Sequence, residues 1–171
     1  MTDTSRDMAA LIRQLESLID AGADGLPEEL FLFVSRITPL VNVDLLIQDD
    51  SRRTLLTWRS DRFFGSGWHV PGGIVRIKEA AAHRVHAVAR VELGAAVTFD
   101  PVPILVEEKI RPAWPERGHT VSLLYRCRLA NTLDPRLRYT PEAPMPDQWL
   151  WHERCPENLI RDHRSYAGYM G

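Results

Sequence analysis

The sequence contains little cysteine. Its 171 residues include only two cysteines, Cys127 and Cys155, and their separation fits no paired metal-ligand spacing. A single pair in a chain of this length does not indicate a disulfide scaffold. We therefore expect both cysteines to behave as small apolar residues.

The sequence also lacks a large net charge and any long apolar run. It has 21 Lys and Arg against 23 Asp and Glu, a formal net charge of -2, and the two signs are interspersed. This distribution creates no long-range field that would recruit nucleic acid or an anionic membrane, so we predict neither partner, and phosphate recognition must be local. No apolar run approaches the roughly 20 residues that span a bilayer, and the start lacks a basic region followed by an apolar stretch. We expect a cytoplasmic protein.

The length and the apolar fraction of 44% suit one compact domain with one extra element. The N-terminal segment has the pattern of an amphipathic helix. Residues 6–20 place apolar side chains at helical spacing, namely Met8, Leu11, Ile12, Leu15, Leu18 and Ile19. The polar face is not markedly basic, which favours packing on the same chain or on a second subunit over a membrane. We expect residues 1–25 to form an N-terminal helix and linker, and residues 26–171 to form the main domain.

The rest of the chain alternates between strand and helix patterns. Pro27 followed by two glutamates favours a second helix to about residue 36. Further helices are predicted at residues 78–93 and 155–170, the last with Pro156 in its first turn, and strands are predicted at residues 40–50, 53–59, 102–110 and 120–129. The first two strands, separated by the turn-forming DDSRR, form a predicted hairpin. Strands, a central helix, more strands and a last helix indicate an α+β fold.

The segment from Trp68 to Ala96 carries the strongest functional signal. Gly73 is followed, after five intervening residues, by Glu79, then by a helical pattern and by the run Glu92-Leu93-Gly94. A glycine pair permits a tight backbone turn, so a carbonyl can point at a bound cation, and the helix offers the Glu92 carboxylate to the same ion. One carboxylate and one carbonyl make a sparse site, but magnesium commonly keeps several waters and takes other oxygens from substrate phosphates.

This spacing resembles the Nudix box, a metal-binding loop, helix and loop of the Nudix hydrolase superfamily. The resemblance implies a Nudix fold, a mixed β-sheet sandwiched between helices, here with an added N-terminal helix. It also implies Mg²⁺ as cofactor, with Mn²⁺ as an alternative, bound by the Gly73 carbonyl, Glu92 and Glu79. For Glu79 a second interpretation stays open, a helix-start residue favoured by the helix dipole.

Residues outside the box resemble a particular branch of that superfamily. The runs ITPLVNVDLLI and LLTWRSDRFFGSGWHVPGG are similar to the entry strands of GDP-mannose mannosyl hydrolases. This resemblance implies hydrolysis of a nucleoside diphosphate linked to another group, a nucleotide sugar of the GDP-mannose type, by a homodimer. It assigns Arg59 to the diphosphate and Asp44 to the nucleotide. Arg62 is a further substrate-binding candidate, with a solvated loop charge as the alternative.

The box departs from the usual pattern on its helix. Ala87 occupies the position of the arginine that normally forms the internal ion pair, so we expect that pair to be missing; Arg90 is either its substitute or a solvated side chain. Val88 and Val91 replace two glutamates that commonly line the metal face, although the mannosyl hydrolase branch also lacks the first box glutamates.

A second departure concerns the catalytic base. The glutamine and histidine expected before the late tryptophan fall on Met145 and Pro146, which cannot accept a proton. His119 at the start of a predicted strand is the candidate catalytic replacement, with an ordinary loop histidine as the alternative. These departures support a second hypothesis, a catalytically impaired Nudix-like domain that binds nucleotide or regulates.

Overall fold

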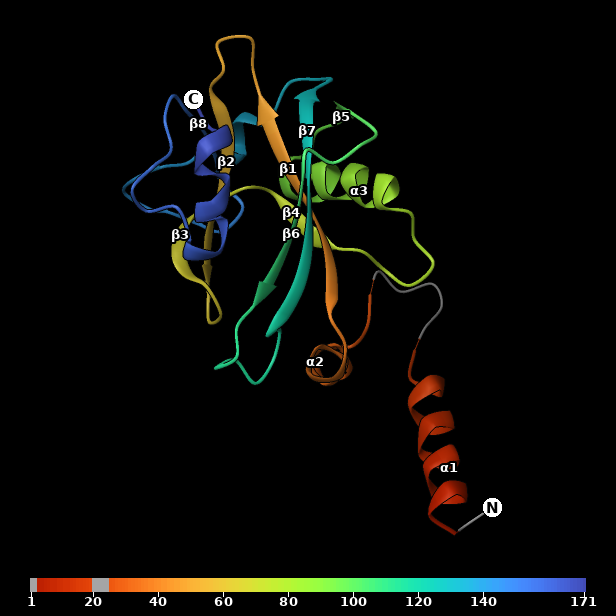
Figure 1. Cartoon of the computed structure of the whole chain (residues 1–171). Coiled ribbons are helices and arrows are strands. Elements are labelled where there is room, and N and C mark those ends of the chain that lie inside the picture. The colour runs from red at the N-terminus through yellow and green to blue at the C-terminus, as the bar shows by residue number, and fades with distance from the viewer. Residues whose placement is uncertain (1–2, 20–24) are drawn as a thin grey trace.

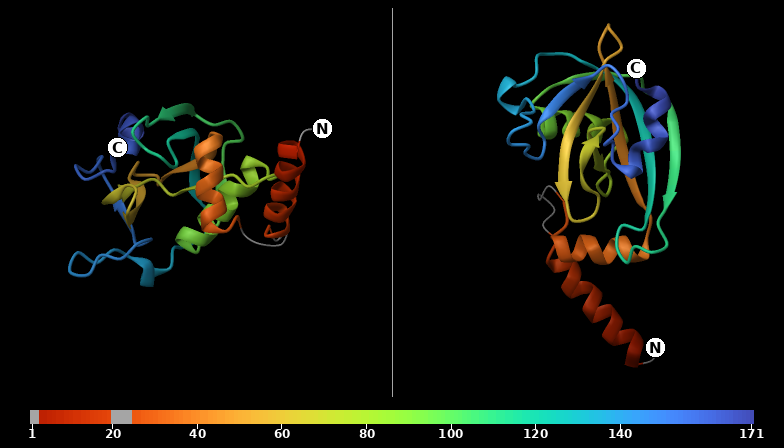
Figure 2. Two further views of the ribbon diagram at one scale, coloured as in Figure 1. Left: turned by 90° about the horizontal axis from the view of Figure 1, so that it is seen from below. Right: turned by 90° about the vertical axis from the view of Figure 1, so that its left-hand side faces the viewer.

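The structure is a computed structural model that describes residues 3–19 and 25–171. Its centre is one mixed eight-stranded sheet. Helix α3 covers one face of this sheet and the C-terminal helix η2 covers the other (Figure 1 and Figure 2). The arrangement confirms the predicted α+β class with a mixed sheet between helices.

The elements follow one another as helices and strands of very different length. The helices are α1 (Asp3–Ser17), α2 (Glu28–Ile37), α3 (Ala81–Leu93) and the 3-10 helices η1 (Pro135–Leu137) and η2 (Arg161–Tyr169). The strands are β1 (Leu40–Gln48), β2 (Thr54–Asp61), β3 (Gly65–His69), β4 (Gly72–Ile74), β5 (Val97–Phe99), β6 (Leu105–Ile110), β7 (His119–Leu129) and β8 (Trp149–His152). The strand order is β3-β2-β1-β7-β5, with β4 beside β1, β6 beside β7 and β8 beside β2.

Strand β1 organises the sheet and divides its core. One edge of β1 pairs in parallel with β7, and the other edge pairs first with β4 and then with β2. Leu45 and Ile47 pack toward α3, whereas Leu46 packs toward η2, so the strand is apolar on both faces, as expected of a parallel strand buried on both sides. Because β4 pairs with the first half of β1, Gly72 lies opposite Asp44.

The long predicted elements are confirmed, with corrections at their ends. The hairpin, the second helix and the central helix are present, but α3 begins at Ala81 because Lys78 has a left-handed φ of 60° and Glu79 lies in a turn. The predicted helix over residues 155–170 is wrong in its first half. It begins at Arg161 as a 3-10 helix, and Pro156 lies in a preceding turn whose carbonyl accepts from Leu159 N–H.

Several short strands were absent from the prediction. Strands β3, β4, β5 and β8 contain five residues or fewer, too few to show a period. The strand predicted over residues 102–110 begins only at Leu105. Within the two described ranges, no helix is long and apolar enough to cross a membrane.

Helix α1 lies apart from the sheet (Figure 1 and Figure 2). It ends near the predicted boundary, although residue 20 lies outside the described ranges. The predicted apolar stripe is exposed, with Leu11 at 55% and Leu18 at 66% of full exposure. Packing of this helix on its own domain is therefore wrong, and packing on a second subunit stays a prediction.

Candidate functional site

A cavity of about 80 Å³ opens where β1, β4, β6, β7 and η2 meet. Its lining combines a glycine pair, two carboxylates, two histidines and four cationic side chains, which are Gly72, Gly73, Asp44, Asp162, His69, His163, Arg59, Lys109, Arg111 and Arg117. The cations outnumber the carboxylates, so the cavity suits an anionic ligand although the whole chain is almost neutral.

The arginines of the cavity are held in place around one aromatic ring. The guanidinium carbons of Arg59, Arg117 and Arg111 lie 5.0, 5.3 and 6.0 Å from the centroid of Phe64. Arg111 also forms an ion pair with Asp162, with Nε 2.8 Å from Oδ1. Burial lowers the pKa of Arg117, and the charges of Arg59 and Arg111 lower it further. Three guanidiniums gathered in this way present several donors to one anion, and their planar forks match phosphate oxygens.

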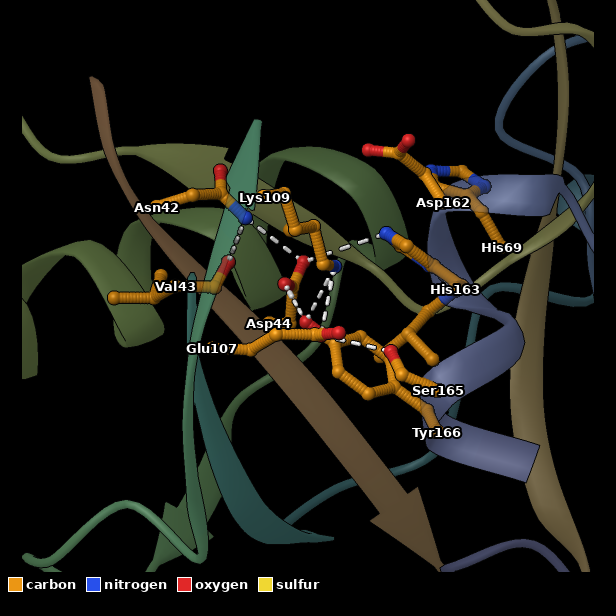
Figure 3. Close-up of polar contacts among 12 residues, drawn as sticks. Asn42, Val43, Asp44, His69, Glu107, Lys109, Asp162, His163, Ser165 and Tyr166 are labelled. Atoms are coloured by element: carbon orange, nitrogen blue, oxygen red, sulfur yellow. Dashed lines mark hydrogen bonds and ion pairs between the residues drawn. The ribbon is translucent and has the colours of Figure 1, made fainter. Parts of the chain in front are cut away.

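Asp44 lies at the base of the cavity within a hydrogen-bond network (Figure 3). It is 1% exposed. Tyr166 Oη donates to Oδ2 over 2.7 Å, Asn42 Nδ2 donates to Oδ1 over 2.8 Å, and Lys109 Nζ donates to Tyr166 Oη over 2.9 Å. Burial raises the pKa of Asp44, while the charge of Lys109 and the bonds from Tyr166 and Asn42 oppose that rise. Because the carboxylate is fully engaged by the protein, it holds the cavity wall in shape.

His163 on η2 connects the network to the glycine strand. Its Nδ1 accepts from Val70 N–H over 3.0 Å, so Nε2 carries the proton and faces Asp44 Oδ1 at 3.8 Å. Burial holds the pKa of His163 well below its ordinary value, and the nearby positive charges add to this effect. The neutral ring of His163 therefore packs between η2 and β1.

The two glycines lie in strand β4 and not in the tight turn that we expected. Neither has a positive φ, so the requirement for glycine comes from close packing. A Cβ on Gly72 would collide with Asp44 Oδ1 and lie 2.8 Å from the Val43 carbonyl oxygen. A Cβ on Gly73 would lie 2.8 Å from Val88 Cγ2. The glycines let β4 approach both β1 and α3.

Glu92, in the last turn of α3, lies beside this cavity and is largely buried. Its side chain is 15% exposed. Gly72 N–H donates to Oε1 over 3.3 Å, and the Thr57 hydroxyl is 3.5 Å from Oε2. Burial raises the pKa of Glu92 to about 8; Arg59 opposes this rise and Asp147 adds to it. A desolvated carboxylate of this kind is a fitting ligand for a divalent cation, whose charge would replace the lost hydration.

The internal ion pair of the box is present, contrary to our expectation. Arg84 Nε donates to Glu79 Oε2 over 2.8 Å, and Arg76 N–H donates to the same oxygen over 2.9 Å. Burial alone would raise the pKa of Glu79, but these contacts outweigh burial and lower it. Arg84 thus replaces the arginine missing at Ala87, whereas Arg90 is exposed. Glu79 stabilises the loop before α3, which favours its structural interpretation.

Arg62 and His119 lie outside the cavity and pair with other residues. Arg62 is exposed and pairs with Glu28 of α2 over 2.8 Å. His119 pairs with Glu108 on the neighbouring strand, with Nε2 2.9 Å from Oε1. The structure therefore brings Asp44, Arg59 and Gly73 together, with Glu92 adjacent, and leaves Arg62, His119 and Glu79 elsewhere.

The sequence analysis missed several cavity residues. Lys109, Arg111 and Arg117 lie on or after β6, and His163 lies on η2, far in sequence from the box. His69 stands directly before the recognised VPGG run and could have been noticed there. In the part of the chain that the structure describes, no group of three or more His, Cys, Asp or Glu side chains is arranged to hold a metal.

Comparison with solved structures identifies the fold. The chain is similar to a MutT Nudix hydrolase from Burkholderia pseudomallei, with TM-score 0.63 and 23% identity over 78% of this chain and 99% of that one. A possible asymmetric diadenosine tetraphosphate hydrolase from Jonesia denitrificans gives TM-score 0.57 and 18% identity over 79% and 98%. A Nudix hydrolase from Nitrosomonas europaea gives TM-score 0.53 and 15% identity over 78% and 80%. The chain therefore has the Nudix fold.

Comparison at the level of sequence adds nothing to this assignment. No protein-family model matches the chain, and no curated protein matches it.

Proposed function

We propose that this chain is a Nudix-type hydrolase of a nucleoside diphosphate linked to another group, with a nucleotide sugar of the GDP-mannose type as substrate. One observation carries the proposal. Four cationic side chains converge on the cavity that the Gly72–Gly73 strand borders, with the Glu92 carboxylate beside it. This combination suits a diphosphate, because the cations would neutralise its oxygens and Glu92 could hold a Mg²⁺ or Mn²⁺ ion that would supply further charge neutralisation.

A second cavity continues from the first and suits the nucleoside. Its volume is about 580 Å³, and it shares Lys109, Arg111 and Asp162 with the first cavity. Phe64 and Trp114 line it, with ring centroids 5.4 Å apart. A nucleobase stacks on such rings, which contributes roughly 1–3 kcal/mol per base in other proteins. The diphosphate would then extend from the aromatic cavity into the cationic one.

The chemistry available to the chain favours metal and arginine catalysis. When bound, a divalent metal ion supplies charge neutralisation at the phosphate oxygens. Arg59 would hold the diphosphate through paired donors. Arg111, whose donors bond Asp162, Arg117 and Thr120, would contribute its positive charge. Neither Pro146 nor His119 lines the cavity, so neither supplies a general base there.

A screen of substrates with parallel binding measurements tests the proposal. Nucleotide sugars and dinucleotides would be incubated with Mg²⁺ or Mn²⁺, with product detection and calorimetric binding on the same samples. We expect metal-dependent hydrolysis of a nucleoside diphosphate derivative. Arg59→Met should weaken nucleotide binding about 10- to 100-fold, because one charge-assisted contact to phosphate is lost. Arg126→Met is the control, since Arg126 is exposed and bonds Gln48 outside the cavity.

A binding or regulatory domain is the second candidate. The observation that favours it is that α3 offers one carboxylate, Glu92, to the glycine strand, since Val88 is buried against the core and Val91 is exposed. Tight nucleotide binding without product across the panel would select this candidate. If no compound of the panel were bound or hydrolysed, both candidate functions would be contradicted.

A further inference from the structure

His69 is a buried histidine with a fixed tautomer at the end of β3. It is 2% exposed. Its Nδ1 lies 2.9 Å from the Thr57 carbonyl oxygen. A carbonyl oxygen can only accept, so Nδ1 carries the proton and Nε2 presents a lone pair. A ring nitrogen anchored in this way, with the other nitrogen free to bind, is typical of metal-ligating histidines.

The free nitrogen faces the Glu92 carboxylate. His69 Nε2 lies 3.8 Å from Glu92 Oε2, too far for a hydrogen bond. The Thr57 hydroxyl is 3.4 Å from Nε2 but only 3.2 Å from Nδ1, so it lies beside the ring and not along the Nε2 lone pair. Arg59, whose positive charge acts on both groups, pairs with Asp61 at 3.3 Å. The two facing atoms therefore lack a hydrogen bond to each other and a salt bridge from Arg59.

The separation of these atoms fits two ligands of one ion. With metal–ligand bonds of about 2.1 Å, two ligands lie roughly 3.0 Å apart at a right angle and roughly 4 Å apart when nearly opposite. The observed 3.8 Å lies between these two values, so a shift of less than about 1 Å would bring the two atoms to the right-angle separation of two ligands. The remaining positions would be filled by water or by substrate oxygens.

We propose that His69 is a metal ligand and that its Nε2 and a Glu92 oxygen together bind one divalent transition-metal ion, with Mn²⁺ preferred to Mg²⁺. Imidazole nitrogen suits transition metals, whereas Mg²⁺ prefers oxygen. His69 would thus compensate for the carboxylates that Val88 and Val91 do not supply. The inference deepens the proposed function through Glu92, but it concerns metal binding and does not depend on turnover.

Metal titration of the full chain without nucleotide tests the preference for Mn²⁺ and the role of His69 in it. Calorimetry and Mn²⁺ electron paramagnetic resonance should show at least about tenfold tighter binding of Mn²⁺ than of Mg²⁺. His69→Asn should weaken Mn²⁺ binding at least about tenfold and change Mg²⁺ binding little. Glu92→Gln should weaken both. Equal Mn²⁺ affinity in folded His69→Asn and in the wild-type chain would overturn the proposal.

A spectroscopic measurement on the wild-type chain keeps the test independent of folding in the variant. Pulsed electron paramagnetic resonance of bound Mn²⁺ should show hyperfine coupling to a histidine nitrogen. The coupling should persist in His163→Asn, a matched control that removes the other buried histidine of the cavity. Absence of nitrogen coupling in the wild-type chain, or its loss only in His163→Asn, would overturn the assignment. Mn²⁺ binding through His69 without hydrolysis would contradict the proposed function alone, and hydrolysis without nitrogen coupling would contradict this inference alone.

Discussion

Arg84 Nε lies 2.8 Å from Glu79 Oε2, and this ion pair joins the first turn of α3 to the loop that follows β4. Both side chains are mostly covered, with 9% and 17% exposure. Glu79 therefore depends on Arg84, because a mostly buried charge that loses its counterion keeps its desolvation cost.

The first prediction concerns this pair. Arg84→Met should lower the free energy of unfolding by about 2 kcal/mol, since Glu79 loses a charged donor while it stays in a partly buried place. Urea unfolding measures the change. Arg90→Met on the exposed face of the same helix is the control, with an expected change below about 0.5 kcal/mol. Similar destabilisation by both substitutions would show that the pair has no special role.

This pair also shows what the sequence can and cannot predict. The spacing from Gly73 to Glu92 predicts the helix and its carboxylate, because both are local in the chain. The spacing does not identify Arg84, since the resemblance assigns the pairing arginine to position 87. The cationic lining is non-local: Lys109 and Arg111 reach the glycine strand only because β7 pairs with β1 and carries β6 beside it.

The elements that differ from the prediction also depend on contacts between segments that are distant in the chain. Strand β1 is long, apolar and bounded by turn residues, so its sequence pattern is sufficient to predict the strand. Strand β4 has three residues and exists because β1 offers a partner edge, which no local pattern records. The region around Pro156 contains helix-compatible residues, but Leu159 is held in the core against Trp68, and the helix starts only after it.

The second prediction concerns the close approach at Gly72. Gly72→Ala should distort β4 and abolish nucleotide or metal binding, because the new Cβ would collide with Asp44 Oδ1 and crowd the Val43 carbonyl. Backbone atoms cannot move aside as a flexible side chain can. Calorimetric binding and circular dichroism measure the two effects. Gly168→Ala is the control, since a Cβ there meets no atom within 4 Å. Wild-type binding by Gly72→Ala would contradict this packing argument.

The third prediction concerns the carboxylate of the box. Glu92→Gln should reduce metal-dependent turnover or binding more than any other box substitution, because several kcal/mol of charge stabilisation are lost, a factor of more than about 100. Glu79→Gln should affect thermal stability more than metal dependence, since Glu79 is engaged by Arg84. Titration with metal and thermal unfolding separate the two outcomes. Unchanged metal dependence in Glu92→Gln would exclude it as a ligand.

The fourth prediction is that the chain forms a homodimer. Helix α1 exposes Met8, Leu11 and Ile12, and an isolated helix of this length is marginally stable in water. Closed two-fold pairs are the commonest way to cover such a face. Light scattering at micromolar concentration should give twice the chain mass. A chain that begins at residue 26 tests whether α1 contributes, and a monomeric mass for the full chain would contradict the prediction.

The last prediction concerns where water attacks the substrate. Attack at a sugar carbon needs a positioned base, which contributes on the order of 10² to 10⁴ in rate. Pro146 cannot supply one, and His119 is paired with Glu108 outside the cavity. The Nε2 lone pair of His69 is assigned to the metal ion and is not available as a base. Attack at phosphorus depends more on charge neutralisation, which Arg59 and a metal at Glu92 can provide. We therefore expect that hydrolysis is either slow or directed at phosphorus.

Hydrolysis in oxygen-18 water distinguishes the two routes. Label in a phosphate product, at a rate that His119→Gln leaves unchanged, is the expected result, because the base is not required and His119 does not line the cavity. Rapid appearance of label in the free sugar would contradict the prediction. If His119→Gln then abolished that turnover, His119 would be the base after all, and the start of β7 would have to move to bring its ring to the substrate.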